Sequence, residues 1–192
     1  MRICIYGASS TLIDPKYIEE TELLGEVLAS EGHGLVFGGG TEGLMGAAAR
    51  GFSRKSGEII GIAPTFFLNV DGILYDQCTE FIYTETMRER KQLMEEKSDA
   101  FIVTPGGIGT FEEFFEILTL KQLGRHTKPI LIYNVMGYFD SMKAMMEDAI
   151  EKKFMKDTCR ELYTFVDTPE AVIDYLQKYT VPSAETKYYK NI

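Results

Sequence analysis

The sequence predicts a doubly wound, parallel α/β sheet folded as a single domain, in the Rossmann-like manner. Short apolar runs of strand length alternate with longer stretches of helical periodicity along nearly the whole chain. Loops of glycine and other small residues follow several of these runs, as expected at the carboxyl ends of parallel strands. The length of 192 residues, 45% of them hydrophobic, suits one well-buried core better than two.

The first half of the chain is expected to contain four strands and three helices. Asp14 followed by Pro15 supplies a cap and a proline for the first helix, which runs as far as Gly32. An alanine-rich helix over 44–49 can pack closely on a sheet. The remaining expected elements of this half are the strands 2–6, 35–37, 58–63 and 80–84 and a helix over 87–97.

The second half continues the alternation, and two segments fall outside it. Residues 64–79 mix apolar and turn residues without a period, which predicts a long ordered loop of the kind that often covers a site. The domain is expected to span 1–179, with 180–192 a loosely held polar tail. The expected elements of this half are the strands 100–103, 130–133 and 162–166 and the helices 111–123, 139–152 and 169–179.

Composition narrows the classes of partner. A formal net charge of −9 disfavours nucleic-acid binding, so a small molecule is the expected ligand. Cys4, Cys78 and Cys159 lack metal-ligand or redox spacing, which indicates reduced thiols in a cytoplasmic protein. His33 and His126 are expected in surface loops, without a metal site. No apolar run is long enough for a membrane span.

The stretch from Thr104 to Glu113 is the strongest candidate for an active-site loop. Gly106, Gly107 and Gly109 follow a buried strand and immediately precede a helix. A helix N-terminus presents unpaired N–H groups and positive partial charge. The sequence therefore predicts a phosphate-binding turn here.

A second glycine loop follows the second expected strand. Gly38, Gly40 and Gly43 match the spacing G-x-G-x-x-G, but the strand over 58–63 ends without the acidic residue that would bind a ribose. Dinucleotide binding is therefore only weakly indicated. Residues 7–10, after the first strand, form a third loop of small residues at the same edge of the expected sheet.

The helix over 87–97 places cations on an apolar stripe. Met87, Arg90, Lys91 and Met94 share one face. If this face packs inward, its charged groups require an anion, because burial of an unpaired charge is costly. Alternatively, the two cations reach past the methionines to water.

Glu113 also allows two interpretations. Thr110 and Glu113 have the spacing of a capping box, in which Thr110 precedes the helix and Glu113 bonds back to it. Alternatively, a carboxylate beside an anion-binding loop, with Arg90 and Lys91 nearby, could cleave a phosphorylated sugar bond. The same helix is apolar on two sides, which suggests a homodimer.

Three motifs, taken together, resemble those of one family. They are GGGTEGLMG from Gly38, MRERK from Met87 and PGGIGTFEE from Pro105. In this order they are similar to the Lonely Guy family of cytokinin riboside 5′-monophosphate phosphoribohydrolases, often labelled "possible lysine decarboxylase". No lysine here can be nominated as a pyridoxal Schiff base, so that label finds no support.

The resemblance implies roles for particular residues. Arg90 and Glu113 match the catalytic arginine and glutamate, whereas Arg88 does not. The implied substrate-binding residues are Lys91, Gly106, Gly107, Gly109, Thr110, Thr119, Gly39, Gly40, Met87 and Ser9.

The expected function is hydrolysis of the N-glycosidic bond of a purine nucleoside 5′-monophosphate, AMP or its N6-prenylated form, without a cofactor. The products are the free base and ribose 5-phosphate. Two alternatives remain: a non-catalytic carrier of a nucleotide or nucleotide cofactor, for which the glycine loops suffice, and, more weakly, an NAD(P)-binding domain.

Overall fold

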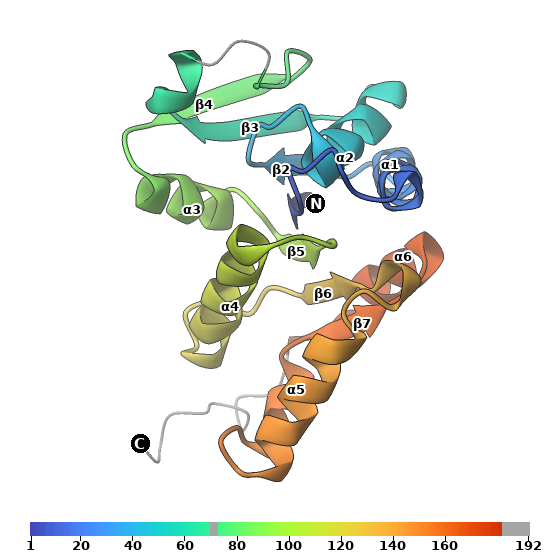
Figure 1. Ribbon diagram of the computed structural model, residues 1–192, viewed down its shortest axis with the longest axis vertical. Coiled ribbons are helices and arrows are strands. Elements are labelled where there is room, and N and C mark those ends of the chain that lie inside the picture. Colours follow the sequence, from blue (N-terminus) through green and yellow to red (C-terminus); the bar gives the residue numbers. More distant parts are fainter. Residues whose placement is uncertain (70–72, 182–192) are drawn as a thin grey trace.

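The computed structural model describes residues 1–69 and 73–181, in which seven strands form one sheet (Figure 1). The strand order is β4-β3-β2-β1-β5-β6-β7, and every neighbouring pair is parallel. The predicted fold class is confirmed. The strands are β1 (Arg2–Tyr6), β2 (Gly34–Phe37), β3 (Ile59–Pro64), β4 (Glu80–Thr84), β5 (Ala100–Val103), β6 (Ile130–Tyr133) and β7 (Thr164–Val166).

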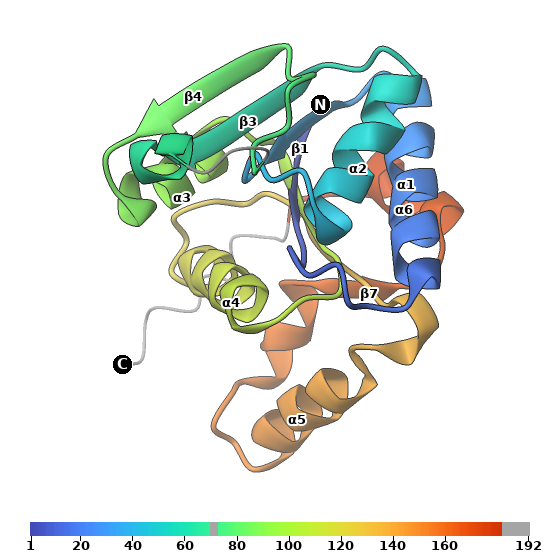
Figure 2. The same ribbon diagram turned by 45° about the horizontal axis from the view of Figure 1, so that its top comes forward.

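Helices cover both faces of the sheet. On one face α1 and α2 run side by side, with α6 beyond them, and on the other lie α3, α4 and α5 (Figure 2). The helices are α1 (Pro15–Ser30), α2 (Gly43–Arg54), α3 (Met87–Glu96), α4 (Ile108–Gln122), α5 (Asp140–Glu151) and α6 (Pro169–Lys178).

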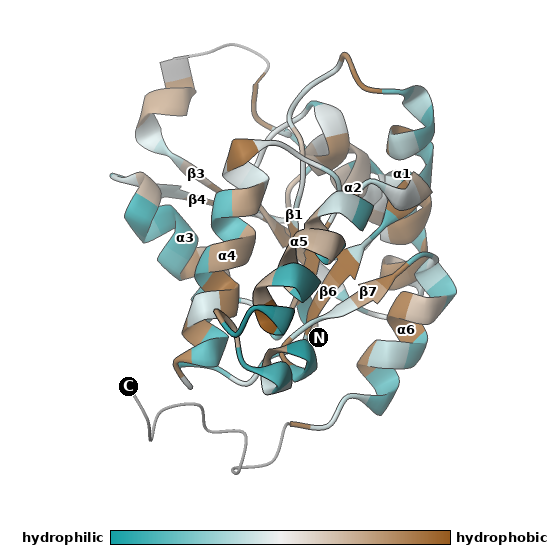
Figure 3. Ribbon diagram, turned by 60° about the horizontal axis from the view of Figure 1, so that its bottom comes forward, coloured by the Kyte–Doolittle hydropathy of each residue, from teal (hydrophilic) through white to brown (hydrophobic). Residues whose placement is uncertain are grey.

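The two helical layers divide the core between them. Along β1, Ile3 and Ile5 pack toward α1 and α2, whereas Cys4 and Tyr6 pack toward α3 and α4. All four side chains are buried, because a central parallel strand is covered on both faces. Figure 3 shows apolar residues along strands such as β6 and β7 and a mixture of polar and apolar residues along helices such as α5.

The loops that follow β1, β2 and β5 meet at one edge of the sheet. The chain leaves β1 toward α1 on one face and leaves β5 toward α4 on the other, so a topological switch point lies between these strands. The N–H of Ala8 donates to the carbonyl of Pro105 (3.0 Å), and the carbonyl of Ala8 accepts from the N–H of Leu44 (2.8 Å). The expected gathering of the small-residue loops is confirmed.

The segment expected as a long ordered loop folds back on the glycine loop that follows β2. A 3₁₀ helix, η1, occupies Thr65–Asn69, and Leu74 forms an antiparallel bridge with Gly40. The hydroxyl of the buried Tyr75 bonds to Ser53 (2.8 Å), which secures this return. Its centre, 70–72, and most of the expected polar tail, 182–192, lie outside the described residues.

The surface placement expected for both histidines is wrong for His126. Its side chain is buried against the end of α4, where Nε2 lies 2.8 Å from the carbonyl of Ile117. Cys4, Cys78 and Cys159 are free thiols. Within 1–69 and 73–181 there is neither a cluster of metal-binding side chains nor a helix of the length and apolarity that a membrane crossing requires.

Candidate active site

A buried ion pair joins α3 to α4 at the carboxyl edge of the sheet. Nη1 of Arg90 donates to Oε1 of Glu113 at 3.0 Å, and the two side chains are 9% and 12% exposed. Oε2 of Glu113 receives no hydrogen bond from the described residues. The pair therefore brings together the two residues expected to be catalytic and leaves one carboxylate oxygen for a water or a substrate.

Burial tunes the carboxylate of this pair. Loss of solvation raises the pKa of Glu113 above its ordinary value, and Arg90 only partly offsets this rise. A carboxyl group whose pKa moves toward neutrality is suited to proton transfer. Such an environment is more typical of a reacting group than of a surface cap.

Arg90 is held by close packing as well as by charge. Its Nε donates to the carbonyl of Ile62 at the end of β3 (3.2 Å). On another side the guanidinium lies against Gly38, where an added Cβ would come within 2.0 Å of Nη2. Gly38 thus provides room for the arginine. Of the two alternatives left open for this face of α3, Arg90 packs inward against an anion, whereas Met87 of the same face is exposed.

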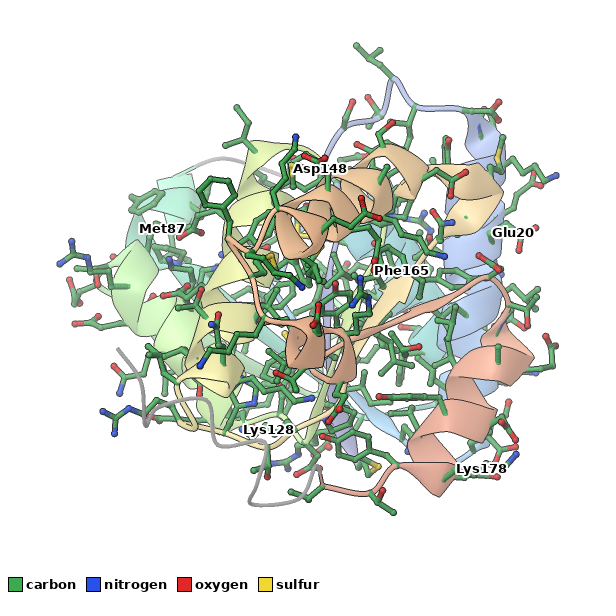
Figure 4. The ribbon with its side chains drawn as sticks, turned by 90° about the horizontal axis from the view of Figure 1, so that it is seen from below. Glu20, Met87, Lys128, Asp148, Phe165 and Lys178 are labelled. Atoms are coloured by element: carbon green, nitrogen blue, oxygen red, sulfur yellow. The ribbon has the colours of Figure 1, made fainter. Side chains whose placement is uncertain are left out.

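The start of α3 is fixed by a capping box. The Thr86 side chain accepts from the N–H of Glu89 (3.2 Å), and the Glu89 carboxylate accepts from the N–H of Thr86 (3.2 Å). Met87, the first residue of the helix, is half-exposed at the side of the molecule away from Lys178 of α6 (Figure 4). The cap sets the position of Arg90 one turn later.

The capping box expected at Thr110 and Glu113 is wrong. Helix α4 begins three residues earlier, at Ile108, so Thr110 lies inside the first turn and Glu113 in the second. The N-cap is Gly107, which has no side chain to occupy the end of the helix. Glu113 is therefore free to pair with Arg90.

The N-terminus of α4 is open. An added Cβ at Gly107 or Gly109 would meet no atom within 4 Å, and both residues are exposed. Within the described part of the chain, no hydrogen bond occupies the N–H groups of Ile108 and Gly109. This arrangement is suited to an anion such as phosphate, because the unpaired N–H groups and the positive end of the helix dipole both face the place that the anion would occupy.

In the glycine loop that follows β2, side chains of the protein itself occupy the space beside the glycines. A Cβ on Gly39 would meet the ring of Phe81, and one on Gly40 would meet Met45. At the N-terminus of α2 the carbonyl of Ala8 already accepts from the N–H groups of Leu44 and Met45. These glycines serve close packing here, and direct substrate contact by Gly39 and Gly40 stays a prediction.

Lys91 lies beside the pair but is engaged by other carboxylates. Its Nζ pairs with Glu112 and, at 2.8 Å, with Glu116, both on α4. Burial opposes the charged form of Lys91, but the two hydrogen-bonded carboxylates outweigh burial and raise its pKa. The lysine thus ties α3 to α4, and its role in binding substrate stays a prediction.

Two further expected substrate contacts, Ser9 and Thr119, are also exposed. Ser9 lies in the loop after β1, close to the open turn in the fold, because the neighbouring Ala8 bonds to Pro105. Thr119 lies on α4 six residues beyond Glu113, or about 9 Å along the helix axis. The structure does not bring Thr119 to the glycine turn.

One contact to the turn was not anticipated from the sequence. The hydroxyl of Tyr138 donates to the carbonyl of Gly106 at 2.6 Å. Tyr138 follows β6 and belongs to none of the motifs, so only its place after a strand could have suggested that it reaches this edge.

Two of the cavities lie in different parts of the molecule. One of about 290 Å³ lies between α3 and α4, and Tyr6 and Lys91 are among its lining residues. Another of about 730 Å³ is lined by Arg2, His33 and Glu58 at the amino ends of the strands. Ligands of doubly wound sheets bind at the carboxyl ends, which favours the edge with the ion pair.

Sequence comparison agrees with this arrangement. A family model described as "Possible lysine decarboxylase" matches residues 45–176. A cytokinin riboside 5′-monophosphate phosphoribohydrolase of Mycobacterium tuberculosis is 38% identical over 86% of this chain and 87% of its own length. One from Arabidopsis thaliana is 34% identical over 93% of this chain and 83% of its own.

Structural comparison extends the likeness of fold. The molybdenum cofactor carrier protein of Chlamydomonas reinhardtii superposes with a TM-score of 0.69 over 92% of this chain and 96% of its own. The sequences are 18% identical, so this likeness concerns the fold alone.

Proposed function

This chain belongs to the Lonely Guy family, and we propose that it hydrolyses the N-glycosidic bond of a cytokinin riboside 5′-monophosphate or of AMP. The products are the free purine base and ribose 5-phosphate. The relatives that carry this activity in their names match most of the chain and most of their own length.

One observation carries the proposal. The buried Arg90–Glu113 pair lies near the start of α4, a helix end that the protein leaves open. A nucleoside monophosphate presents a phosphate for the turn and, one ribose away, a glycosidic carbon for the carboxylate. Glu113 and the turn belong to consecutive turns of one helix, which suits that separation.

The chemical roles follow from charge. Bond cleavage builds positive charge on the ribose, and the Glu113 carboxylate stabilises that charge or removes a proton from the attacking water. Arg90 fixes the orientation of the carboxylate and contributes positive charge for the phosphoribosyl group. The N–H groups of the turn hold the phosphate, so the substrate is positioned at both ends.

The first test is base release. Incubation with AMP and, separately, with N6-isopentenyl-AMP is followed by chromatography for adenine and isopentenyladenine. Release of a base together with ribose 5-phosphate supports hydrolysis, and the ratio of kcat/KM values identifies the preferred nucleotide. Intact nucleotides after prolonged incubation would contradict the proposal.

Replacement of Glu113 tests the carboxylate. Glu113→Gln should lower kcat by about 10²-fold or more, because the amide neither stabilises cationic charge nor takes a proton. Binding of AMP, measured by calorimetry, should change little. The matched control is Glu147→Gln, which breaks the Glu147–Arg160 ion pair on α5 and should keep kcat within about twofold. A near-normal rate in Glu113→Gln would refute the assignment.

A carrier of a nucleotide or nucleotide cofactor is the second candidate. The observation that favours it is the fold shared with molybdenum cofactor carrier and binding proteins, at TM-scores of 0.68–0.69. A carrier would bind AMP without releasing a base, and its affinity would be unaffected by loss of the Glu113 charge. Base release that depends on Glu113 excludes this candidate.

Two further proposals concern the state of the protein. We propose a homodimer that covers apolar side chains exposed on η1, β4, α3 and α4; they are Phe66, Leu68, Tyr83, Met87, Ile108 and Phe115. We also propose the cytoplasm as its compartment, because all three thiols are unpaired.

A further inference from the structure

Tyr138 lies outside every motif that predicted the site, yet its hydroxyl holds the carbonyl of Gly106 at 2.6 Å. We propose that Tyr138 is a positioning residue for the phosphate group, which it serves by orienting the peptide between Gly106 and Gly107. This inference rests on the proposed function, because it assigns the turn to a phosphate.

The geometry of the peptide bond links the tyrosine to the ligand. In a trans peptide the C=O and N–H groups point in opposite directions. With the Gly106 carbonyl fixed toward Tyr138, the N–H of Gly107 is directed away from it. A hydrogen bond accepted at the carbonyl also polarises the peptide and strengthens its N–H as a donor.

This peptide needs an external restraint. It joins two glycines, the residues with the widest range of backbone conformation, and the space beside Gly107 is open. Without the hydroxyl, rotation of this peptide would carry the N–H of Gly107 away from its direction in the structure. Tyr138 supplies the restraint from the opposite side, without occupying the place of a ligand.

The corner that carries Tyr138 is itself firmly fixed. Met136 and Gly137 both adopt left-handed backbone conformations, with φ of 54° and 71°. The Asn134 side chain accepts from the N–H of Phe139 at 2.7 Å and closes the corner. A left-handed methionine is strained, and such strain persists only where the surroundings determine the conformation.

The ring of Tyr138 is supported independently of its hydroxyl. It meets Tyr17 of α1 edge-on, with ring centroids 6.0 Å apart, and lies perpendicular to Phe139 at 4.9 Å. Tyr138 is 40% exposed. Phenylalanine has the same ring without the hydroxyl and therefore fits the same space. Tyr138→Phe therefore deletes the hydrogen bond to Gly106 and retains the packing.

The test compares this variant with a matched control. The hydroxyl of Tyr179 donates to the carbonyl of Thr127, also at 2.6 Å, so Tyr179→Phe removes an equivalent bond at the other end of the sheet. Calorimetry measures the Kd for inorganic phosphate, ribose 5-phosphate and adenine. Steady-state kinetics with AMP gives KM and kcat, and thermal unfolding gives Tm.

In Tyr138→Phe we expect the Kd for inorganic phosphate and ribose 5-phosphate, and the KM for AMP, to rise about three- to tenfold. The Kd for adenine and the kcat should stay within about twofold. Tyr179→Phe should leave the kinetic and binding constants unchanged, and Tm should fall no further in Tyr138→Phe than in the control.

The outcomes separate this inference from the proposed function. Weaker phosphate binding in Tyr138→Phe supports the inference even if the wild-type protein releases no base. Equal phosphate affinity in the variant and the wild type overturns the inference alone, as does equal weakening toward adenine. Failure of the wild-type protein to bind either phosphate probe overturns this inference, whereas the proposed function is overturned by intact AMP after prolonged incubation.

Discussion

At the scale of single residues, the site depends on which groups are left without an internal partner. One carboxylate oxygen of Glu113 accepts a hydrogen bond from Arg90, and the other accepts none from the described residues. The first N–H groups of α4 likewise have no hydrogen-bond partner among these residues. At the N-terminus of α2, by contrast, the Ala8 carbonyl accepts from the N–H groups of Leu44 and Met45. The free groups mark where a ligand completes the structure.

His126 illustrates the opposite case, a titratable group satisfied in its neutral form. Nδ1 accepts from the N–H of Lys128 (3.2 Å), so Nε2 carries the proton and donates to the Ile117 carbonyl. Burial, which the hydrogen bond to Ile117 opposes only in part, lowers the pKa of His126 to about 4. Protonation of Nδ1 in the folded state would place its N–H against the N–H of Lys128, so that two donors would face each other without an acceptor.

We therefore expect the free energy of unfolding to depend on pH through His126. The unfolded chain binds this proton near pH 6.5 and the folded chain only near pH 4, so stability falls as the pH is lowered between these values. The loss is on the order of 2–3 kcal/mol at pH 4. Urea unfolding at pH 7, 6, 5 and 4 should show a shallower pH dependence in His126→Gln; an identical dependence in the variant would exclude this role.

At the scale of elements, α3 shows how a local sequence motif sets the position of Arg90, the arginine proposed to act in catalysis. Its capping box fixes the first turn, and Arg90 follows at once in the second. The end of a helix that lacks its cap frays within about one turn. The cap is therefore expected to affect activity as well as stability.

Thr86→Ala should lower the free energy of unfolding by about 1 kcal/mol. It should also lower kcat/KM for the nucleotide several-fold, since Arg90 is then held less firmly. Thr168→Ala is the control, because Thr168 caps α6 through a bond to the N–H of Ala171 of the same length, 3.2 Å. That variant should lose similar stability and keep its activity; equal kinetic effects in the two variants would contradict the link to Arg90.

The elements themselves were largely predictable from the sequence, and the exceptions have physical causes. Strands buried on both faces are apolar throughout, so runs such as 100–103 and 130–133 were located to the residue. The start of α4 was misplaced because Gly107, the N-cap, and Gly109 have no side chains to add to an apolar pattern. Glycine at these two positions nevertheless does not prevent the first helical turn from forming. The sequence also held no indication that residue 138 bonds to residue 106, since that contact depends on the path of a corner after β6.

At the scale of the whole molecule, the sheet fixes where α3 and α4 lie, and these two helices carry the side chains proposed to act on the substrate. Both helices also carry the exposed apolar side chains assigned to the proposed dimer. Phe115 on α4 is 37% exposed beside the fully buried Phe114, which makes this helix apolar on its inner side and partly so on its outer side.

Light scattering coupled to size-exclusion chromatography tests the dimer. The wild-type protein should elute with twice the mass of one chain, and Phe115→Glu should shift it toward the monomer, because burial of a charge in an apolar interface is costly. Phe154→Glu is the control, since Phe154 is 85% exposed three residues beyond the end of α5 and belongs to none of the elements assigned to the dimer. A wild-type monomer at working concentration would exclude the dimer.

The ion pair between α3 and α4 also has a consequence for the order of folding. Arg90 and Glu113 lie 23 residues apart, whereas Tyr6 and Thr104, which bond at the end of the central strand pair, lie 98 apart. Closing the shorter loop costs roughly 1 kcal/mol less chain entropy. The two side chains proposed to act on the substrate are therefore easier for the unfolded chain to bring together than the strands that support them.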